Sequence, residues 1–257
     1  MLDLNCEAIQ KHIIIPLSIE WWQVNVICMI VIASILFTCK FCSQSQLKKI
    51  SYIIGTLLCF RILFVQFYQM QINVWNFETS IPLHLCGLSS ILSGLVLFRN
   101  NQFAYECLFY WGIAGALQSF LTPQLNLGNS DIILYLDYFI SHSGIILSAL
   151  FLTVIIGMRP RENSWFKVFL FSQLLIPVIG GINIIINNLI INGKINHCAV
   201  VDGDIIKNGA NYMYLYAKPA VDNPLLIGDW PYYIIFIELI ALIHFWLLYQ
   251  PIKMFKK

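Results

Sequence analysis

The chain has 257 residues, of which 59% are hydrophobic and only 11% are charged. About 25% charged residues are typical of a soluble domain, so this composition excludes an ordinary water-soluble globule and predicts an integral membrane protein. The net charge is +2, and the basic residues form no stripe interleaved with aromatic side chains. We therefore expect the bilayer, and no nucleic acid, as a partner.

The first segment, residues 1–20, carries three acidic side chains and no cleavage site after a basic start. It is predicted to be a short ordered leader and not a removed signal peptide. Seven later segments approach the length of about 20 mostly apolar residues that a spanning helix needs. These predicted spans are 20–42, 50–72, 81–98, 104–122, 138–157, 165–187 and 231–250.

The orientation follows from the basic residues, which concentrate in cytoplasmic loops of membrane proteins. Alternate connections carry ten of the 15 basic residues on one side, the other side carries four, and Arg61 lies inside a span. The sequence thus predicts one membrane-embedded, all-α domain over 1–257, a seven-helix bundle with the N-terminus outside and the C-terminus in the cytoplasm. The longest connection, 188–230, is outside, a length typical of a functional lid or gate or else of a disordered segment.

Most of the eight cysteines have an ordinary explanation. Cys39 and Cys42 are spaced C-x-x-C, but they lack the strand–helix context of a redox motif and are interpreted as packing residues. Cys6 and Cys198 both fall on the outer side, and whether they are bridged stays open. Cys86 differs because of the polar residues predicted to surround it.

Four polar side chains on four predicted spans lie at similar depths. At ~1.5 Å per helical residue, Cys86 is ~7–8 Å, Gln118 ~6 Å and Glu238 ~10 Å below the outer boundary. His142 is ~6 Å deep if its span begins after Asp137. Polar side chains inside a membrane are costly, so their convergence predicts a functional site in the outer third of the bilayer.

The depth of His142 depends on where its helix begins. A start at Ile132 would place His142 ~15 Å deep. Asp137 is flanked by Tyr135 and Tyr138, which suit the interface, and as an N-cap it would give a span of 20 residues. We therefore expect the helix to begin at 138.

A cysteine and a histidine in an apolar pocket favour acyl transfer. The His142 imidazole would take the Cys86 proton and leave a thiolate nucleophile. Hydrogen-bond donors would stabilise the oxyanion that develops on an attacked ester. Candidate donors are Gln118, Ser89, Ser90 and the backbone N–H groups near Gly87.

Each of these residues also has a purely structural explanation. A lone cysteine usually fills space, and Gln118 would act as a hydrogen bond between helices. Glu238 would neutralise Arg61. His84 is two residues from Cys86, so on a helix it would face away, where it would contact head groups or orient a neighbouring loop.

Several separated motifs carry a resemblance to a known family. They are Pro82-Leu-His-Leu-Cys86, the run Tyr110 to Pro123, Phe139-Ile-Ser-His142, Asn211-Tyr-Met-Tyr-Leu with Lys218-Pro219, and Gly228-Asp-Trp-Pro-Tyr-Tyr with Glu238. Over about 75–251 this ordered set resembles the transmembrane protein 164 family, which includes bacterial YwaF-like membrane proteins.

The resemblance implies a multi-pass protein of a bacterial plasma membrane. It further implies an acyltransferase that moves an acyl chain from a phospholipid to a lysophospholipid without a cofactor. The family's cysteine maps onto Cys86 and its histidine onto His142. Gln118, Glu238, His84, Asn211 and Tyr212 are then expected to support the pair or to bind substrate.

Two other functions stay open on the sequence. A metal-dependent lipid hydrolase would draw its ligands from His84, Cys86, His142 and Glu238, a poor set if His84 faces away. A transporter or a structural subunit of a membrane complex would use the polar cluster as a binding site or as contacts between helices.

Overall fold

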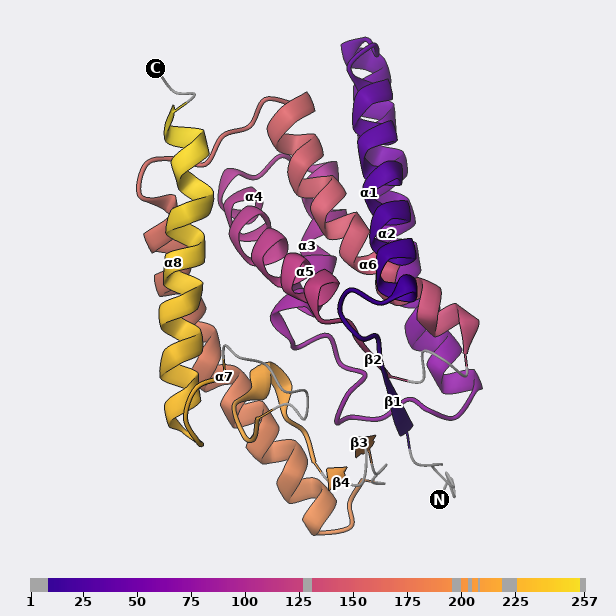
Figure 1. Cartoon of the computed structure of the whole chain (residues 1–257), viewed down its shortest axis with the longest axis vertical. Helices are drawn as coiled ribbons and strands as arrows, with labels where there is room; N and C mark the ends of the chain where they lie inside the picture. The colour runs from indigo at the N-terminus through magenta and orange to yellow at the C-terminus, as the bar shows by residue number, and fades with distance from the viewer. Residues whose placement is uncertain are drawn as a thin grey trace.

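The protein is a bundle of helices that run up and down, with a small sheet at one end (Figure 1). The computed structural model describes residues 9–126, 131–195, 200–202, 205–207, 209–218 and 226–254. The α-helices are α1 (Ile19–Cys39), α2 (Gln44–Gln71), α3 (Leu85–Phe98), α4 (Gln102–Cys107), α5 (Ile113–Leu121), α6 (Ile132–Leu150), α7 (Ser164–Ile191) and α8 (Tyr232–Met254). Two π-helical turns, η1 (Leu108–Gly112) and η2 (Phe151–Ile155), and the 3₁₀ turn η3 (Tyr212–Tyr214) complete the helical elements of these residues.

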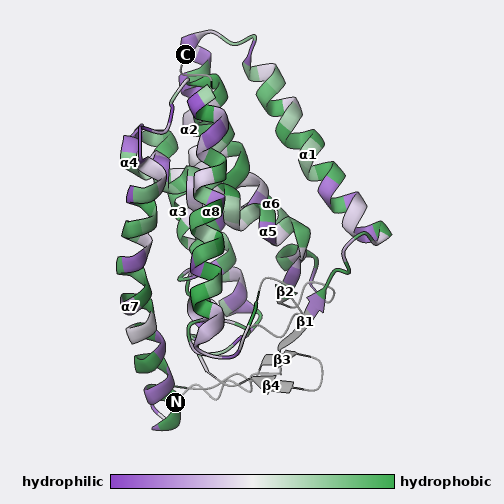
Figure 2. Cartoon of the chain, turned by 60° about the vertical axis from the view of Figure 1, so that its left-hand side comes forward, coloured by the Kyte–Doolittle hydropathy of each residue, from purple (hydrophilic) through white to green (hydrophobic). Residues whose placement is uncertain are grey.

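Five helices are long and apolar enough to cross a membrane: α1, α2, α6 with η2, α7 and α8. Figure 2 shows that apolar residues dominate most of their length. The prediction of seven spans is supported for these five. The segment predicted over 81–98 is helical only from Leu85, which leaves a helix of 14 residues. The segment predicted over 104–122 is helical, but it is divided into α4, η1 and α5.

The α4–η1–α5 helix forms the centre of the bundle and is buried on most sides. Three of its aromatic residues form hydrogen bonds with residues of neighbouring helical elements. Tyr105 pairs with the Thr153 hydroxyl at 2.8 Å, Tyr110 with Ser164 at 2.9 Å, and the Trp111 ring N–H donates to Ser172 at 2.8 Å. Burying an aromatic ring while satisfying its polar atom holds these helices in one register.

Small residues bring α2 and α3 close together. A Cβ added at Gly55 would lie 3.0 Å from the carbonyl oxygen of Gly94. The Ser51 hydroxyl of α2 also donates to the carbonyl of Leu97 at 2.7 Å. Such contacts are typical of helix pairs in membranes, where packing replaces the hydrophobic effect. They fix α3, the helix that begins at the predicted site.

The all-α prediction is wrong at one end of the bundle, which we name the strand end. Four short strands, β1 (Ile9–Ile13), β2 (Gln124–Asn126), β3 (Val200–Asp202) and β4 (Ile205–Lys207), form a sheet in the order β2-β1-β3-β4. Only the β1–β3 pairing is parallel. Strands of three residues are too short to show an alternating pattern in the sequence. Cys6 and Cys198, whose bridging stayed open, lie outside the described residues.

Part of the long connection predicted over 188–230 packs against α7. The Asn183 amide donates to the carbonyl of Tyr212 and accepts from its N–H, both at 3.0 Å. Asn187 makes the same pair of bonds to Ala210, at 3.1 and 2.6 Å. Two asparagines one turn apart thus bind the backbone of 209–218 as a strand partner would, and this segment covers the region where α3 begins.

Candidate active site

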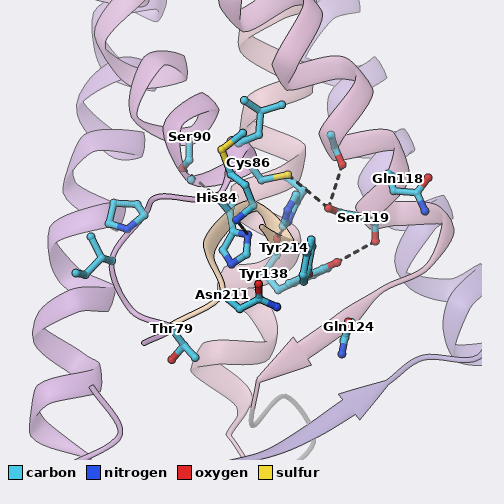
Figure 3. A pocket seen from close by; sticks show the side chains of 18 of the residues that line it. Thr79, His84, Cys86, Ser90, Gln118, Ser119, Gln124, Tyr138, Asn211 and Tyr214 are labelled. Atoms are coloured by element: carbon cyan, nitrogen blue, oxygen red, sulfur yellow. Dashed lines mark hydrogen bonds between the residues drawn. The ribbon is translucent and has the colours of Figure 1, made fainter. Parts of the chain in front are cut away.

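One cavity of about 660 Å³ lies between the helices near the strand end (Figure 3). Its walls come from α2, α5, α6, α7 and α8, the start of α3, and the non-helical segments 74–84 and 209–215. Six of the seven site residues expected from the sequence line it: His84, Cys86, Gln118, His142, Asn211 and Glu238. Tyr212 is not among the lining residues.

Cys86 is the second residue of α3, because the helix begins later than the apolar pattern predicts. Residues 81–84 are not helical, and His84 is the extended N-cap residue. Gly87 allows this geometry, since a Cβ there would lie 2.7 Å from the backbone of Pro82. Residues 81–84 therefore pack closely against the first turn of α3, and Cys86 lies in that first turn.

The first turn of α3 offers free hydrogen-bond donors beside the sulfur. Within the described part of the chain, the N–H groups of Leu85 and Gly87 have no backbone acceptor, the N–H of Cys86 is directed at its own sulfur, and His84 supplies no side-chain cap. A helix N-terminus stabilises negative charge through such N–H groups and through its dipole. A thiolate at Cys86, or an oxyanion beside it, would lie at this positive end.

The Cys86 sulfur contacts α5. It lies 3.8 Å from the Ser119 hydroxyl, which donates to the carbonyl of Gly115 at 3.0 Å (Figure 3). A Cβ on Gly115 would be 2.9 Å from the sulfur, so the missing side chain makes room for it. Ser119 was not among the residues predicted for the site, although it follows Gln118 in the run from Tyr110 to Pro123 and is four residues, one helical turn, from Gly115.

His142 projects from α6 and is only 8% exposed. Its Nδ1 lies 2.6 Å from the carbonyl of Tyr138, and its ring packs against the Tyr138 ring with centroids 4.4 Å apart. A carbonyl can only accept, so Nδ1 carries the proton and Nε2 keeps its lone pair. His142 is thereby held in the tautomer that a general base at Nε2 requires. Tyr138, four residues earlier on the same helix, was also missed.

The predicted start of α6 at residue 138 is wrong. The helix begins at Ile132, and Asp131 is its N-cap, accepting from the N–H groups of Ile133 and Leu134 at 2.9 Å each. By helical rise, His142 is thus ~15 Å from the start of its helix and not ~6 Å. Both aspartates precede apolar helical residues, so the sequence offered two similar caps.

Cys86 and His142 come from helices that pack together and line the same cavity. In the described part of the chain, no hydrogen bond joins the two side chains directly. The thiol instead rests against Ser119. Catalytic hydrogen bonds are often long in unliganded enzymes and shorten when substrate binds.

Asp137, which is not an N-cap, pairs with Arg61 of α2. The same guanidinium donates to the Ser90 hydroxyl at 2.6 Å. Ser90 is one turn after Cys86 on α3, and Asp137 is five residues before His142 on α6. Arg61 therefore fastens the helix of the cysteine to the helix of the histidine.

The prediction that Glu238 neutralises Arg61 is also wrong. Glu238 lies on α8 and accepts a hydrogen bond from Gln173 of α7 at 2.5 Å. It faces the same cavity from the other side. Asp137 neutralises the positive charge of Arg61. The Glu238 carboxyl is therefore a separate polar group in the wall of the cavity.

His84, Asn211 and Tyr212 hold the loop over the cavity. His84 does not face away from Cys86, because it precedes the helix, and its Nδ1 accepts from the N–H of Met213 at 3.2 Å. The Asn211 side chain closes its own loop, with its amide donating to Ala217 at 2.7 Å. Burial raises the pKa of Tyr212, so its hydroxyl stays protonated and donates to the carbonyl of Phe77 at 2.8 Å.

Gln118 donates to the Thr122 hydroxyl, one turn later on the same helix, at 2.9 Å. Gln118 lines the cavity, and Figure 3 shows its side chain beside Ser119. Among the described residues, no group of three or more His, Cys, Asp or Glu side chains could hold a metal ion. The four ligands considered for a metal-dependent hydrolase therefore line one cavity without forming a metal site.

Comparison with known proteins places the chain in a family without adding a reaction. No curated protein and no solved structure matches it significantly. Residues 16–249 match the TMEM164 family. Because this match spans most of the chain, the protein belongs to the TMEM164 family.

Proposed function

We propose that the protein is a phospholipid acyltransferase in which Cys86 is the nucleophile and His142 the general base. The observation that carries the proposal is the placement of Cys86 at the free N-terminus of α3, in one cavity with a histidine whose Nδ1–H is already donated. The nucleophile, the base and the donors for an oxyanion thus surround one space.

In the first half of the reaction, Nε2 of His142 takes the proton of the Cys86 thiol. The thiolate attacks the ester carbonyl of a phospholipid, and the N–H groups of Cys86 and Gly87 stabilise the oxyanion. Collapse breaks the ester C–O bond, and His142 returns the proton to the departing lysophospholipid oxygen. An acyl thioester on Cys86 remains.

In the second half, the hydroxyl of an acceptor lysophospholipid gives its proton to His142 and attacks the thioester. The acyl chain moves to the acceptor oxygen, and the proton returns to the sulfur. For the first proton transfer the sulfur must turn from Ser119, 3.8 Å away, toward His142. The proposal requires this movement to take place when lipid binds.

The proposal includes seven spans with the N-terminus outside. The continuous α4–η1–α5 helix, 102–121, would rise ~30 Å, about the thickness of the hydrocarbon core. The shorter α3 is preceded by non-helical chain, which is tolerated at membrane depth where it lines a cavity inside the protein. The basic side chains at the end opposite the sheet would face the cytoplasm; they include Lys40, Lys48, Lys49, Arg99, Arg159, Arg161 and Lys253.

The test is a search for the covalent intermediate. Purified protein is incubated with phosphatidylcholine, and the mass of the peptide that contains Cys86 is measured. We expect an increase equal to one acyl group, abolished by hydroxylamine and absent in Cys86→Ala. Cys59→Ala is the matched control, because Cys59 lies on α2 outside the cavity lining. If Cys86→Ala transfers acyl chains as fast as wild type, the mechanism is wrong.

Two further outcomes separate the remaining functions. Loss of activity on adding a chelator, with bound metal at unit stoichiometry, would favour a metal-dependent hydrolase. Stoichiometric protein partners together with an unaltered Cys86→Ala phenotype would favour a transporter or a structural subunit. Neither outcome is expected if the thioester forms.

A further inference from the structure

The cavity has an apolar extension beyond the residues assigned to the chemistry at Cys86. On α8 its lining residues recur along one face, at Ile234, Ile237, Ala241 and Phe245. Phe169, Ser172 and Ile176 line it from α7. From Ile234 to Phe245 the helix rises ~16 Å. The extension therefore runs along α7 and α8, away from the strand end.

The far end of this extension is formed by buried aromatic side chains. Phe245 is 2% exposed, and its ring packs against that of Tyr110 with centroids 5.5 Å apart. The Ser172 hydroxyl accepts from Trp111 and donates to the carbonyl of Val168 at 2.9 Å. Glu238, the polar residue of the α8 wall, accepts from Gln173 at 2.5 Å, so both polar side chains of the wall have partners and its remaining residues are apolar, as suits a hydrocarbon.

We propose that this extension, the acyl arm, receives the chain being transferred and that its far end limits the chain length. This inference rests on the proposed function. One leaflet's acyl chain spans about half of the ~30 Å hydrocarbon core, or ~15 Å, and the acyl arm is ~16 Å long. A single extended chain of ordinary membrane length fits it.

Ala241 is the position at which the length of the acyl arm can be shortened. It lies one turn before Phe245, between that ring and Ile237, and its methyl group keeps the acyl arm open at this level. A phenylalanine side chain at this position would close the last turn of the acyl arm. Long acyl chains would then no longer fit in the acyl arm, whereas phospholipids with short acyl chains would still bind with their ester carbonyl at Cys86.

The test compares transfer from dioctanoyl and dipalmitoyl phosphatidylcholine. In Ala241→Phe, the rate ratio of the long donor to the short donor should fall about tenfold or more, the usual scale for apolar groups that no longer fit a pocket. The matched control is Ile243→Phe, because Ile243 lies on the same helix and is 55% exposed on its outer surface. An unchanged ratio in Ala241→Phe, with transfer intact, would overturn the inference and leave the proposed function standing.

A second measurement does not depend on turnover or on the folding of Ala241→Phe. Cys86→Ser protein is mixed with a phosphatidylcholine that carries a diazirine at the end of one acyl chain, and it is then irradiated. We expect cross-links at the lining residues Phe169, Ile176, Ala241 and Phe245, reduced in Phe245→Trp. Cross-links confined to lipid-facing positions such as Leu239 and Ile243 would refute the acyl arm even if Cys86 forms a thioester.

Discussion

Gly115→Ala tests whether the position of the Cys86 sulfur controls the reaction. The new methyl carbon would lie 2.9 Å from the sulfur, and movement of about 0.5 Å would bring the pair to ordinary contact near 3.4 Å. A misplacement of 1 Å in an active site can cost about 100-fold in rate, so we expect a loss of about tenfold. Overpacking costs about 1–3 kcal/mol, which the roughly 1 kcal/mol gained by alanine in a helix partly offsets.

The assay is acyl transfer from labelled phosphatidylcholine by purified protein in mixed micelles, with thermal unfolding measured on the same samples. Gly181→Ala is the control, because a Cβ at Gly181 on α7 would meet nothing within 4 Å. We expect it to keep the wild-type rate and to gain up to about 1 kcal/mol of stability. Wild-type transfer by a folded Gly115→Ala protein would refute the reasoning that the sulfur needs this space.

Three further substitutions test the support of the site. His142→Gln should lower transfer by about 100-fold or more without changing the unfolding temperature, because it removes the base; an active variant would exclude His142 from that role. Arg61→Met should cost about 3–5 kcal/mol of stability, because Asp137 is left without its partner, and Arg61→Met with Asp137→Leu should recover most of it. If the double variant is as unstable as Arg61→Met alone, the loss of stability does not come from the unpaired Asp137. Tyr212→Phe should cost about 1–3 kcal/mol, because the Phe77 carbonyl and the Ile81 N–H lose their partner. Limited proteolysis within residues 74–84 should then be faster. An unchanged digestion rate would contradict the inference that Tyr212 holds this segment in place.

The long helices were predictable because their signal is composition over about 20 residues. The residues at which these helices begin and end were harder to predict. Asp131 and Asp137 are equivalent as caps in sequence, and only the position of Arg61, 70 to 76 residues earlier, decides that Asp137 belongs inside the bundle. The helix start at Leu85 depends in the same way on the contact between Gly87 and Pro82, a tertiary feature that an apolar run does not reveal.

Six of the seven predicted site residues line the cavity, but the depth of His142 and the partners of these residues were not predictable. Helical rise placed Cys86, Gln118 and Glu238 near one level, but it gives no angle around the bundle. The pairing of Glu238 with Gln173, and of the sulfur with Ser119, required the packing of different helices. Serine and glutamine inside a membrane bundle are common enough that neither had a distinguishing pattern.

The position of β1 has a consequence for how the protein is made. This strand is synthesised before α1, yet its parallel partner β3 is synthesised only after α7. Until then, one edge of β1 has exposed N–H and C=O groups, which can pair with other chains. Assembly of this end must therefore wait for most of the chain, and nascent forms that stop before Val200 are expected to be those that aggregate or are degraded.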